Sequence, residues 1–334
     1  MDTVFINKYF LNKFWLIVFC TILTALTGCS PNKQAVKTIK QDSDGVYASA
    51  LSDDGSLSLM STNDQQLTLW QLEPIPKLRF RWQQKSRNNV FIVKFSPQHQ
   101  FAISASRHDF AVWSTKNGHS LGYWSISESV IRDIAISANG QIVLAGLEDG
   151  KVIAVNLKTG RRLEFLGHTE AINEVRLSAN GLYAFTAGNG GNALLWNTQT
   201  AQIVSRFKLP GRITQIAFDK EGHYAFIADS HNHAFIYRIP ANQKISHLSI
   251  HTRQQIFTCA RFVNHAKWLL TGSPSRKLQL WDRQTGQLLQ QWQVGLNTKR
   301  RPASAIVFDA TLSRHDQIVS SSSSGLIEYW NIHQ

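Results

Sequence analysis

The chain has 334 residues, of which 43% are hydrophobic and 10% aromatic. Lys and Arg outnumber Asp and Glu by 35 to 22, so the formal net charge is +13. This composition allows a sizeable buried core, and the lack of heptad repeats or of a hydrophobic span beyond the N-terminal one excludes a coiled coil and a membrane protein with several spans.

The first residues have the pattern of a signal peptide. Lys8 and Lys13 precede a mostly apolar run, Phe14 to Thr27, which is too short to span a hydrocarbon core of ~30 Å. The run ends in Leu26-Thr27-Gly28-Cys29, which resembles the cleavage box of bacterial lipoproteins. The resemblance implies a signal peptide over 1–28, lipidation of Cys29 and a tether over 29–34. An ordinary secretory signal with a coincidental cysteine is the alternative.

Two further expectations follow from this N-terminus. Ser30 stands where an aspartate would favour retention in the inner membrane, so resemblance to enterobacterial sorting predicts the periplasmic face of the outer membrane for a Gram-negative source. Cys20 leaves with the signal and Cys29 is lipidated, so Cys259 alone remains and no intrachain disulfide is expected. Cys259 lies in the apolar stretch Phe257 to Phe262, where a free cysteine is usually a small buried side chain.

After the tether, a unit of four short strands recurs seven times. In the clearest copy, strands are predicted over Ile172 to Ser178, Tyr183 to Ala187, Ala193 to Trp196 and Gln202 to Phe207. One residue near the end of each third strand marks the copies: Trp70, Trp113, Val155, Trp196, Tyr237, Trp281 and Trp330. Their spacing of 41 to 49 residues is typical of four-stranded units stacked around an axis. We attribute the long last interval to loop growth in 295–302 and 309–316.

The two ends of the chain are predicted to share one sheet. Ala35 to Ile39 reads as a strand before the first full copy at Val46, and the chain ends just after a third strand, at Trp330. The seventh unit lacks its outer strand unless the N-terminal strand supplies it, which would close the ring without an open edge. A tether of about six residues reaches only ~20 Å, so the rim near the seventh unit is expected to stay close to the membrane.

These units resemble WD40 repeats, over about residues 35–334. Gly167-His168 and Trp281-Asp282 match signature dipeptides of that family, and Ser96-Pro97 and Ser178-Ala179-Asn180-Gly181 resemble its turn after the first strand. The resemblance implies an all-β fold: a seven-bladed WD40-like β-propeller closed by an N-terminal strand, after a cleaved lipoprotein signal.

One departure from the family pattern concerns its buried network of His, Ser, Asp and Trp. The aspartate six residues before the third-strand marker is present as Asp64 and Asp149, whereas His168 belongs to a copy with Gly190 at that place. The network is therefore expected to be incomplete in every blade, with apolar packing as the main source of stability.

Basic residues are predicted to gather on the propeller face formed by the loops between fourth and first strands and between second and third strands. They include Arg107, Lys299, Arg300 and Arg301. A binding patch for an acidic protein or an anionic envelope polymer is one interpretation. A solvated basic surface is the other. Nucleic acid is not expected as a partner, because the signal takes the chain out of the cytoplasm and no nucleic-acid motif accompanies the charge.

One aligned position at the start of each first strand opens, in WD40 proteins, onto the partner-binding face. It is occupied by Tyr47, Phe91, Arg132, Asn173, Thr214, Thr258 and Ser304. Tyr47, Phe91 and Arg132 are adjacent in blade order and belong to types enriched at interface hot spots, so they are the predicted contact centre. The alternative is that Tyr47 and Phe91 only pack between neighbouring blades.

No sequence motif for catalysis, phosphate binding or metal binding is present, and no cofactor or metal is expected. The first functional hypothesis is a non-enzymatic, membrane-tethered interaction scaffold for a periplasmic or envelope protein, as a monomer or in a hetero-complex. An accessory of outer-membrane protein assembly is one specific version. The second is a propeller hydrolase or lyase acting on an envelope carbohydrate or lactone, which a cluster of His with Asp or Glu at the channel mouth would favour.

Overall fold

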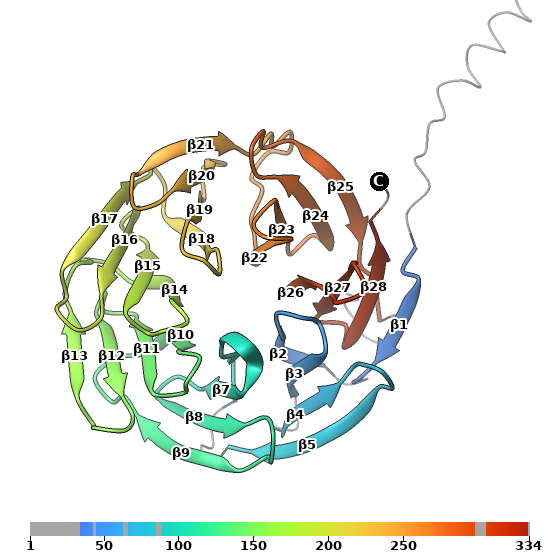
Figure 1. Ribbon diagram of the computed structural model, residues 1–334, viewed down its shortest axis with the longest axis horizontal. Coiled ribbons are helices and arrows are strands. Elements are labelled where there is room, and N and C mark those ends of the chain that lie inside the picture. Colours follow the sequence, from blue (N-terminus) through green and yellow to red (C-terminus); the bar gives the residue numbers. More distant parts are fainter. Residues whose placement is uncertain (1–33, 43–44, 63–65, 85–88, 298–304, 333–334) are drawn as a thin grey trace, which may run out of the picture. The chain divides into compact units, whose positions relative to one another are not determined.

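A computed structural model describes residues 34–42, 45–62, 66–84, 89–297 and 305–332. Within these residues, 28 strands form seven four-stranded antiparallel sheets, which are the blades of a ring (Figure 1). Residues 34–334 form one compact unit. The predicted signal peptide, Cys29 and the basic run Lys299 to Arg301 lie outside the described residues.

Each blade is built from strands that follow one another in the chain, except that the seventh takes one strand from the N-terminus. Blade 1 contains β2 (Val46–Leu51), β3 (Leu57–Thr62), β4 (Gln66–Gln71) and β5 (Lys77–Gln83). Blade 2 contains β6 (Ile92–Phe95), β7 (Phe101–Ala105), β8 (Asp109–Ser114) and β9 (Ser120–Ser125). Blade 3 contains β10 (Ile131–Ile136), β11 (Ile142–Leu147), β12 (Val152–Asn156) and β13 (Arg162–Phe165). Blades 4 and 5 contain β14 (Ile172–Leu177), β15 (Tyr183–Gly188), β16 (Asn192–Asn197) and β17 (Ile203–Lys208); and β18 (Ile213–Phe218), β19 (Tyr224–Asp229), β20 (Ala234–Arg238) and β21 (Gln243–His247). Blades 6 and 7 contain β22 (Cys259–Val263), β23 (Trp268–Gly272), β24 (Lys277–Asp282) and β25 (Leu288–Gln293); and β26 (Val307–Leu312), β27 (Gln317–Ser322), β28 (Leu326–Asn331) and β1 (Lys37–Lys40).

The predicted closure of the ring is confirmed. β1 pairs antiparallel with β28, with Lys37 opposite Tyr329 and Lys40 opposite Leu326. The N-terminal strand is thus the outer strand of blade 7, and Ile39 packs against the buried cluster shared by blades 7 and 1. Because β28 has a partner on both sides, blade 7 has four strands like the other six blades.

Aromatic side chains join neighbouring blades. An aromatic residue on the outer strand of one blade stacks on the third-strand marker of the next. Trp82 lies 5.1 Å from Trp113 between ring centroids, and Phe165 lies 4.1 Å from Trp196. The seven markers all lie in third strands, as predicted. Apolar and aromatic contacts between sheets therefore form the core between blades.

The buried polar network of blade 4 stops short of the family pattern. Nε2 of His168 lies 2.9 Å from Oγ1 of Thr186, and the indole N–H of Trp196 donates to the same oxygen at 3.1 Å. Gly190 stands at the position of the family's aspartate, so no carboxylate extends this hydrogen-bond network. The indole-to-hydroxyl half of the network recurs between Trp281 and Thr271 in blade 6.

The sequence alignment of blade 7 was wrong at its first strand. β26 begins at Val307, and the turn after it is built on Ser313, whose hydroxyl accepts the backbone N–H of Gln317 at 3.2 Å. Asp309 is therefore a strand residue and the added length lies before β26. The seventh member of the aligned position is Phe308, not Ser304.

Candidate functional site

The two faces of the propeller carry different loops. Turns between first and second strands and between third and fourth strands lie on the face turned toward the viewer in Figure 1, which we call the front face. Loops that lead into first strands, and turns between second and third strands, lie on the opposite, back face. Tyr47 and Phe91 stand at the start of first strands and therefore belong to the back face.

In most blades, a β-bulge in the first strand sets the direction of the side chain at the aligned position. In blades 1, 3, 4, 5 and 7 the pairing of first and second strands shifts by one residue at this position, for example between Ile131 and Asp133, so Arg132 has no partner in the ladder. A bulge of this kind redirects a side chain and is common beside binding sites. The same bulge therefore presents a different side chain in each of these five blades.

Tyr47 and Phe91 meet on the back face and remain exposed. Their rings are 5.8 Å apart between centroids in an edge-to-face arrangement, and 37% of Tyr47 and 49% of Phe91 are exposed. Arg132 is exposed on the next blade, and the carbonyl of the exposed Arg107 accepts the backbone N–H of Ile131 at 2.7 Å. The structure brings these four predicted residues into one region. Tyr47 and Phe91 pack on each other and keep exposed surface, which combines the two interpretations that the sequence left open.

The remaining aligned residues are used within the propeller. Asn173 donates to the carbonyl of Ile213 at 2.7 Å, and Thr258 donates to that of Val307 at 2.5 Å. Phe308 packs against the cluster between blades 7 and 1. At the aligned position, therefore, the exposed aromatic and basic side chains lie on blades 1 to 3.

The central channel contains a ring of alternating side chains that sequence reasoning missed. A cavity of about 910 Å³ runs along the first strands. The residue three positions after the aligned one lines this cavity in every blade. In blade order these residues are Ala50, Lys94, Ala135, Arg176, Ala217, Arg261 and Thr311. Small residues between long cations let the cations extend into a narrow space. The pattern is visible in the sequence once the register of all seven first strands is known.

Carboxylates from the first strands neutralise these cations. Lys94 Nζ lies 2.6 Å from Asp133 of the next blade, and Arg261 Nη2 lies 2.7 Å from Asp309 of blade 7. Arg176 pairs with Glu174 on its own strand. Burial lowers the pKa of Lys94 and raises that of Glu174. The middle of the channel is thus crossed by ion pairs and is not a basic funnel.

The same carboxylates also connect neighbouring blades through the backbone. Asp133 accepts the N–H of Val175 at 2.8 Å, and Glu174 accepts that of Ile216 at 2.5 Å. Each bond runs from a first strand to the first strand of the next blade. The channel charges therefore hold the ring together as well as neutralise one another.

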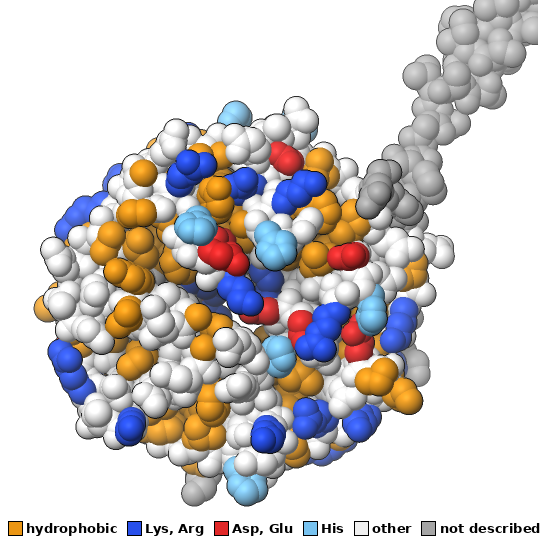
Figure 2. All heavy atoms as spheres, viewed as in Figure 1, with side chains coloured by type: hydrophobic (Ala, Val, Ile, Leu, Met, Phe, Trp, Pro, Cys, Tyr) orange, Lys and Arg blue, Asp and Glu red, His pale blue; other side chains and the backbone are white. Residues whose placement is uncertain are grey.

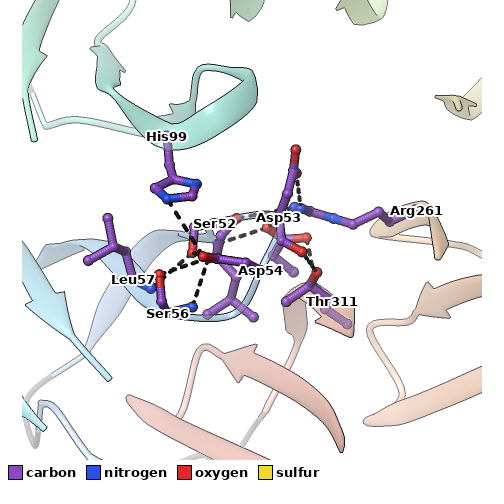
Figure 3. Close-up of polar contacts among 11 residues, drawn as sticks. Ser52, Asp53, Asp54, Ser56, Leu57, His99, Arg261 and Thr311 are labelled. Carbon is purple, nitrogen blue, oxygen red and sulfur yellow. Dashed lines mark hydrogen bonds and ion pairs between the residues drawn. The ribbon is translucent and has the colours of Figure 1, made fainter. Parts of the chain in front are cut away.

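The turn between β2 and β3 forms a polar junction on the front face (Figure 3). Asp53 pairs with Arg261 of blade 6 at 2.5 Å, and its carbonyl accepts the hydroxyl of Thr311 of blade 7 at 2.7 Å. Asp54 accepts hydrogen bonds from Ser52 and Ser56 at 2.7 and 2.8 Å, and His99 lies 3.7 Å away. Burial opposes ionisation of Asp54, but these bonds and His99 outweigh it and lower its pKa to about 2.

One carboxylate at the front mouth of the channel is incompletely bonded. Asp219 lines the cavity together with Glu221 and His265. Its Oδ1 accepts the backbone N–H of Tyr224 at 2.5 Å, while Oδ2 is buried without a hydrogen-bond partner among the described residues. Burial raises the pKa of Asp219. Within the described part of the chain, no group of three or more His, Cys, Asp or Glu side chains is arranged to hold a metal ion.

Comparison with known proteins identifies two of the repeats directly. The family model described as WD domain, G-beta repeat matches residues 160–197 and 242–282. These ranges contain the first three strands of blades 4 and 6, each preceded by the outer strand of the blade before. No curated protein matches the chain. Among the described residues no helix is long and apolar enough to cross a membrane.

Proposed function

We propose that this seven-bladed β-propeller, which carries WD40 repeats, is a non-enzymatic interaction scaffold that binds a protein partner on its back face. The observation that carries the proposal is the exposed ring pair of Tyr47 and Phe91. The two residues stand at the start of neighbouring first strands, with exposed arginines on blades 2 and 3. Aromatic and Arg side chains of this kind supply large contact area at little cost in conformational entropy.

The charges beside the aromatic pair point to the chemistry of the partner. Arg107 and Arg132 are both exposed, and no ion pair joins either of them to a described carboxylate. A guanidinium group prefers a carboxylate as its bidentate partner. We therefore expect a segment that places an apolar residue on the ring pair and an acidic residue beside it.

The proposed location is the bacterial cell envelope, with the chain anchored by lipid on Cys29. Support comes from the order of features in residues 1–29: basic residues, an apolar run and then the box that ends in Cys29. In Cys29→Ala, radiolabelled palmitate should not be incorporated, and high salt should extract the protein from the membrane fraction while the lipidated wild type stays. Equal extraction of the two proteins by salt, or palmitate on Cys29→Ala, would contradict the anchor.

Crosslinking in intact cells followed by mass spectrometry tests the scaffold. The wild type is compared with a triple variant, Tyr47→Ala, Phe91→Ala and Arg132→Ala, and with a control, Tyr183→Ala and Leu289→Ala, which truncates apolar residues of similar exposure elsewhere. We expect one set of captured proteins to be lost only from the triple variant. An identical set from all three proteins would reject this face.

A hydrolase or lyase acting on an envelope carbohydrate or lactone is the second candidate. The observation that favours it is Asp219, whose buried and unpaired oxygen shares the channel mouth with His265. A carboxyl group with a raised pKa is suited to general acid catalysis. If this candidate is correct, Asp219→Asn abolishes turnover of envelope glycans while the crosslinked set stays unchanged.

A further inference from the structure

The turn between β4 and β5 carries an exposed apolar tip on the front face. Ile75 is 72% exposed, more than any other large hydrophobic residue described, and it lies between the prolines Pro74 and Pro76. The start of the turn is held in the core, because Leu72 is fully buried in the cluster that contains Ile39 of β1. Ile75 is thus exposed to solvent on a turn whose first residue is packed in the core.

Cations surround this tip on three adjacent blades. They are Lys37 on β1, Lys77 and Arg79 on β5, Lys116 in the turn between β8 and β9, and Arg314 in the turn between β26 and β27. All five are exposed. Figure 2 shows this face, with hydrophobic side chains at the rim beside β5 and Lys and Arg side chains around them.

A hollow beside the tip is lined by three of these five cations. Its volume is about 720 Å³, and Arg79, Lys116 and Arg314 line it together with His99. Arg79 Nη2 donates to the carbonyl of Lys116 at 3.4 Å, which holds the two side by side. Glu73 also lines the hollow. The hollow therefore offers the cationic side chains of Arg79 and Lys116 to an anionic group, with one carboxylate beside them.

The acidic residues of this region are mostly turned inward. The side chains of Asp54 and Glu73 are each only 17% exposed. Asp54 forms an ion pair with Arg314 and lies 3.7 Å from His99, and Glu73 lies 3.6 Å from His315. Asp316 is the exposed carboxylate of the neighbouring turn. The surface that reaches solvent around Ile75 is consequently positive.

The chain enters the propeller at this same face. β28 runs from the back face toward the front face, and β1 runs antiparallel to it, so the first residue of β1, Lys37, lies at the front end. Glu73, in the turn that carries Ile75, is close enough to Tyr329, opposite Lys37, to raise its pKa through charge repulsion, after burial as the larger cause. The tip and the start of the propeller are therefore neighbours.

From this arrangement we infer that the front face of blades 7, 1 and 2 docks on an anionic lipid bilayer. Ile75 enters the headgroup layer, Lys37 and Lys77 meet lipid phosphates, and the hollow receives a headgroup. An apolar tip within a basic surface is a known form of interfacial membrane binding. The orientation rests on the proposed lipid anchor, since a short tether from Cys29 leaves the chain at this face. The back face then points away from the membrane, toward the partner.

Vesicle co-sedimentation of the mature chain with Cys29→Ala tests direct docking without the lipid. This chain retains every strand of the closed propeller. At about 0.1 M salt it should bind phosphatidylcholine vesicles that contain phosphatidylglycerol and not vesicles of phosphatidylcholine alone, and high salt should release it. Ile75→Asp should weaken binding about tenfold or more, and Lys37→Glu with Lys77→Glu should do the same.

Matched controls separate the patch from general charge and hydrophobicity. Leu166→Asp changes a residue of equal exposure, 70%, on the back face, and Lys158→Glu with Arg161→Glu reverses two charges in the corresponding turn of blade 3. Each control should weaken vesicle binding much less than the patch variant with the same change in net charge. Equal loss from Ile75→Asp and Leu166→Asp, or no preference for anionic vesicles, would overturn docking.

Two other results would also decide the matter. If Ile75→Asp abolishes self-association in the absence of vesicles, the tip belongs to a contact between copies and the membrane assignment is wrong. If the wild type carries lipid on Cys29 but the Cys29→Ala chain ignores anionic vesicles, the anchor stands and docking alone fails. Vesicle binding by a chain that is never lipidated in cells would support docking and reject the anchor.

Discussion

The carboxylate of Asp309 accepts a hydrogen bond of 2.8 Å from the backbone N–H of Leu51, a residue 258 positions earlier in the chain. The bond joins the first strand of blade 7 to the first strand of blade 1. It repeats the bonds from Asp133 to Val175 and from Glu174 to Ile216 between other neighbouring blades. The ring is therefore closed at its centre by the same contact that joins blades elsewhere, and at its rim by β1.

Asp309→Ala should destabilise the propeller strongly. The change leaves Arg261 with its weaker, more exposed partner Asp53 and removes the acceptor of a backbone N–H, so we expect a loss of about 3 kcal/mol in the free energy of unfolding. Urea denaturation of Cys29→Ala chains with and without the substitution measures it. Asp316→Asn, on the exposed turn of the same blade, removes a carboxylate and keeps a side chain suited to the positive φ there, so it should change stability by less than about 0.5 kcal/mol. Equal effects would contradict a structural role for the channel carboxylate.

Removal of the N-terminal strand should open the ring. A chain that begins at Gln41 lacks β1, which leaves β28 as an unpaired edge and exposes apolar surface that Ile39 covers. We expect a lower melting temperature and concentration-dependent self-association by light scattering. A chain that begins at Gln34 retains β1 and should behave as the mature chain does. A monomeric and equally stable Gln41 chain would show that closure by β1 is dispensable.

His168 should make stability depend on pH. Burial, with a smaller contribution from Arg206, lowers its pKa from 6.5 to about 4. The folded protein therefore binds this proton less readily than the unfolded chain, and its contribution to stability is present above pH 6.5 and is lost as the pH falls toward 4. The loss should be on the order of 3 kcal/mol. Denaturation between pH 7 and pH 4 should show a flatter profile for His168→Gln, whereas exposed His251→Gln should retain the slope of the wild type.

Cys259 should be unreactive in the folded protein. It is 7% exposed, and burial raises the pKa of its thiol, so little thiolate forms near neutral pH. In the Cys29→Ala chain without its signal, Cys259 is the sole cysteine. We expect negligible reaction with a thiol reagent under native conditions and complete reaction in denaturant. Rapid native modification would mean that blade 6 opens locally.

The fold was predictable from sequence because its signals are local. Period, strand alternation and turn residues identify each blade separately, and the missing outer strand beside Trp330 predicts closure by residues near Ile39. The alignment failed in blade 7, where Asp309 resembles a turn residue but lies in β26.

The chemistry of the sites was less predictable, because it depends on contacts between blades. The edge-to-face contact of Tyr47 and Phe91 depends on the angle between neighbouring sheets. The pairing of Lys94 with Asp133, 39 positions away, likewise requires the assembled channel. Ile75 lies in the turn between β4 and β5, but Lys37 and Arg314 belong to blade 7 and lie on the same face only because the ring is closed.

The most direct test of the scaffold places a photoreactive phenylalanine analogue at position 91 in intact cells. If the back face of blades 1 to 3 binds a partner, irradiation should produce a discrete crosslinked protein, whose yield falls when Tyr47→Ala and Arg132→Ala are added. The same analogue at position 183, which is similarly exposed, should not produce it. No crosslink at position 91, or equal yields at both positions, would contradict the scaffold.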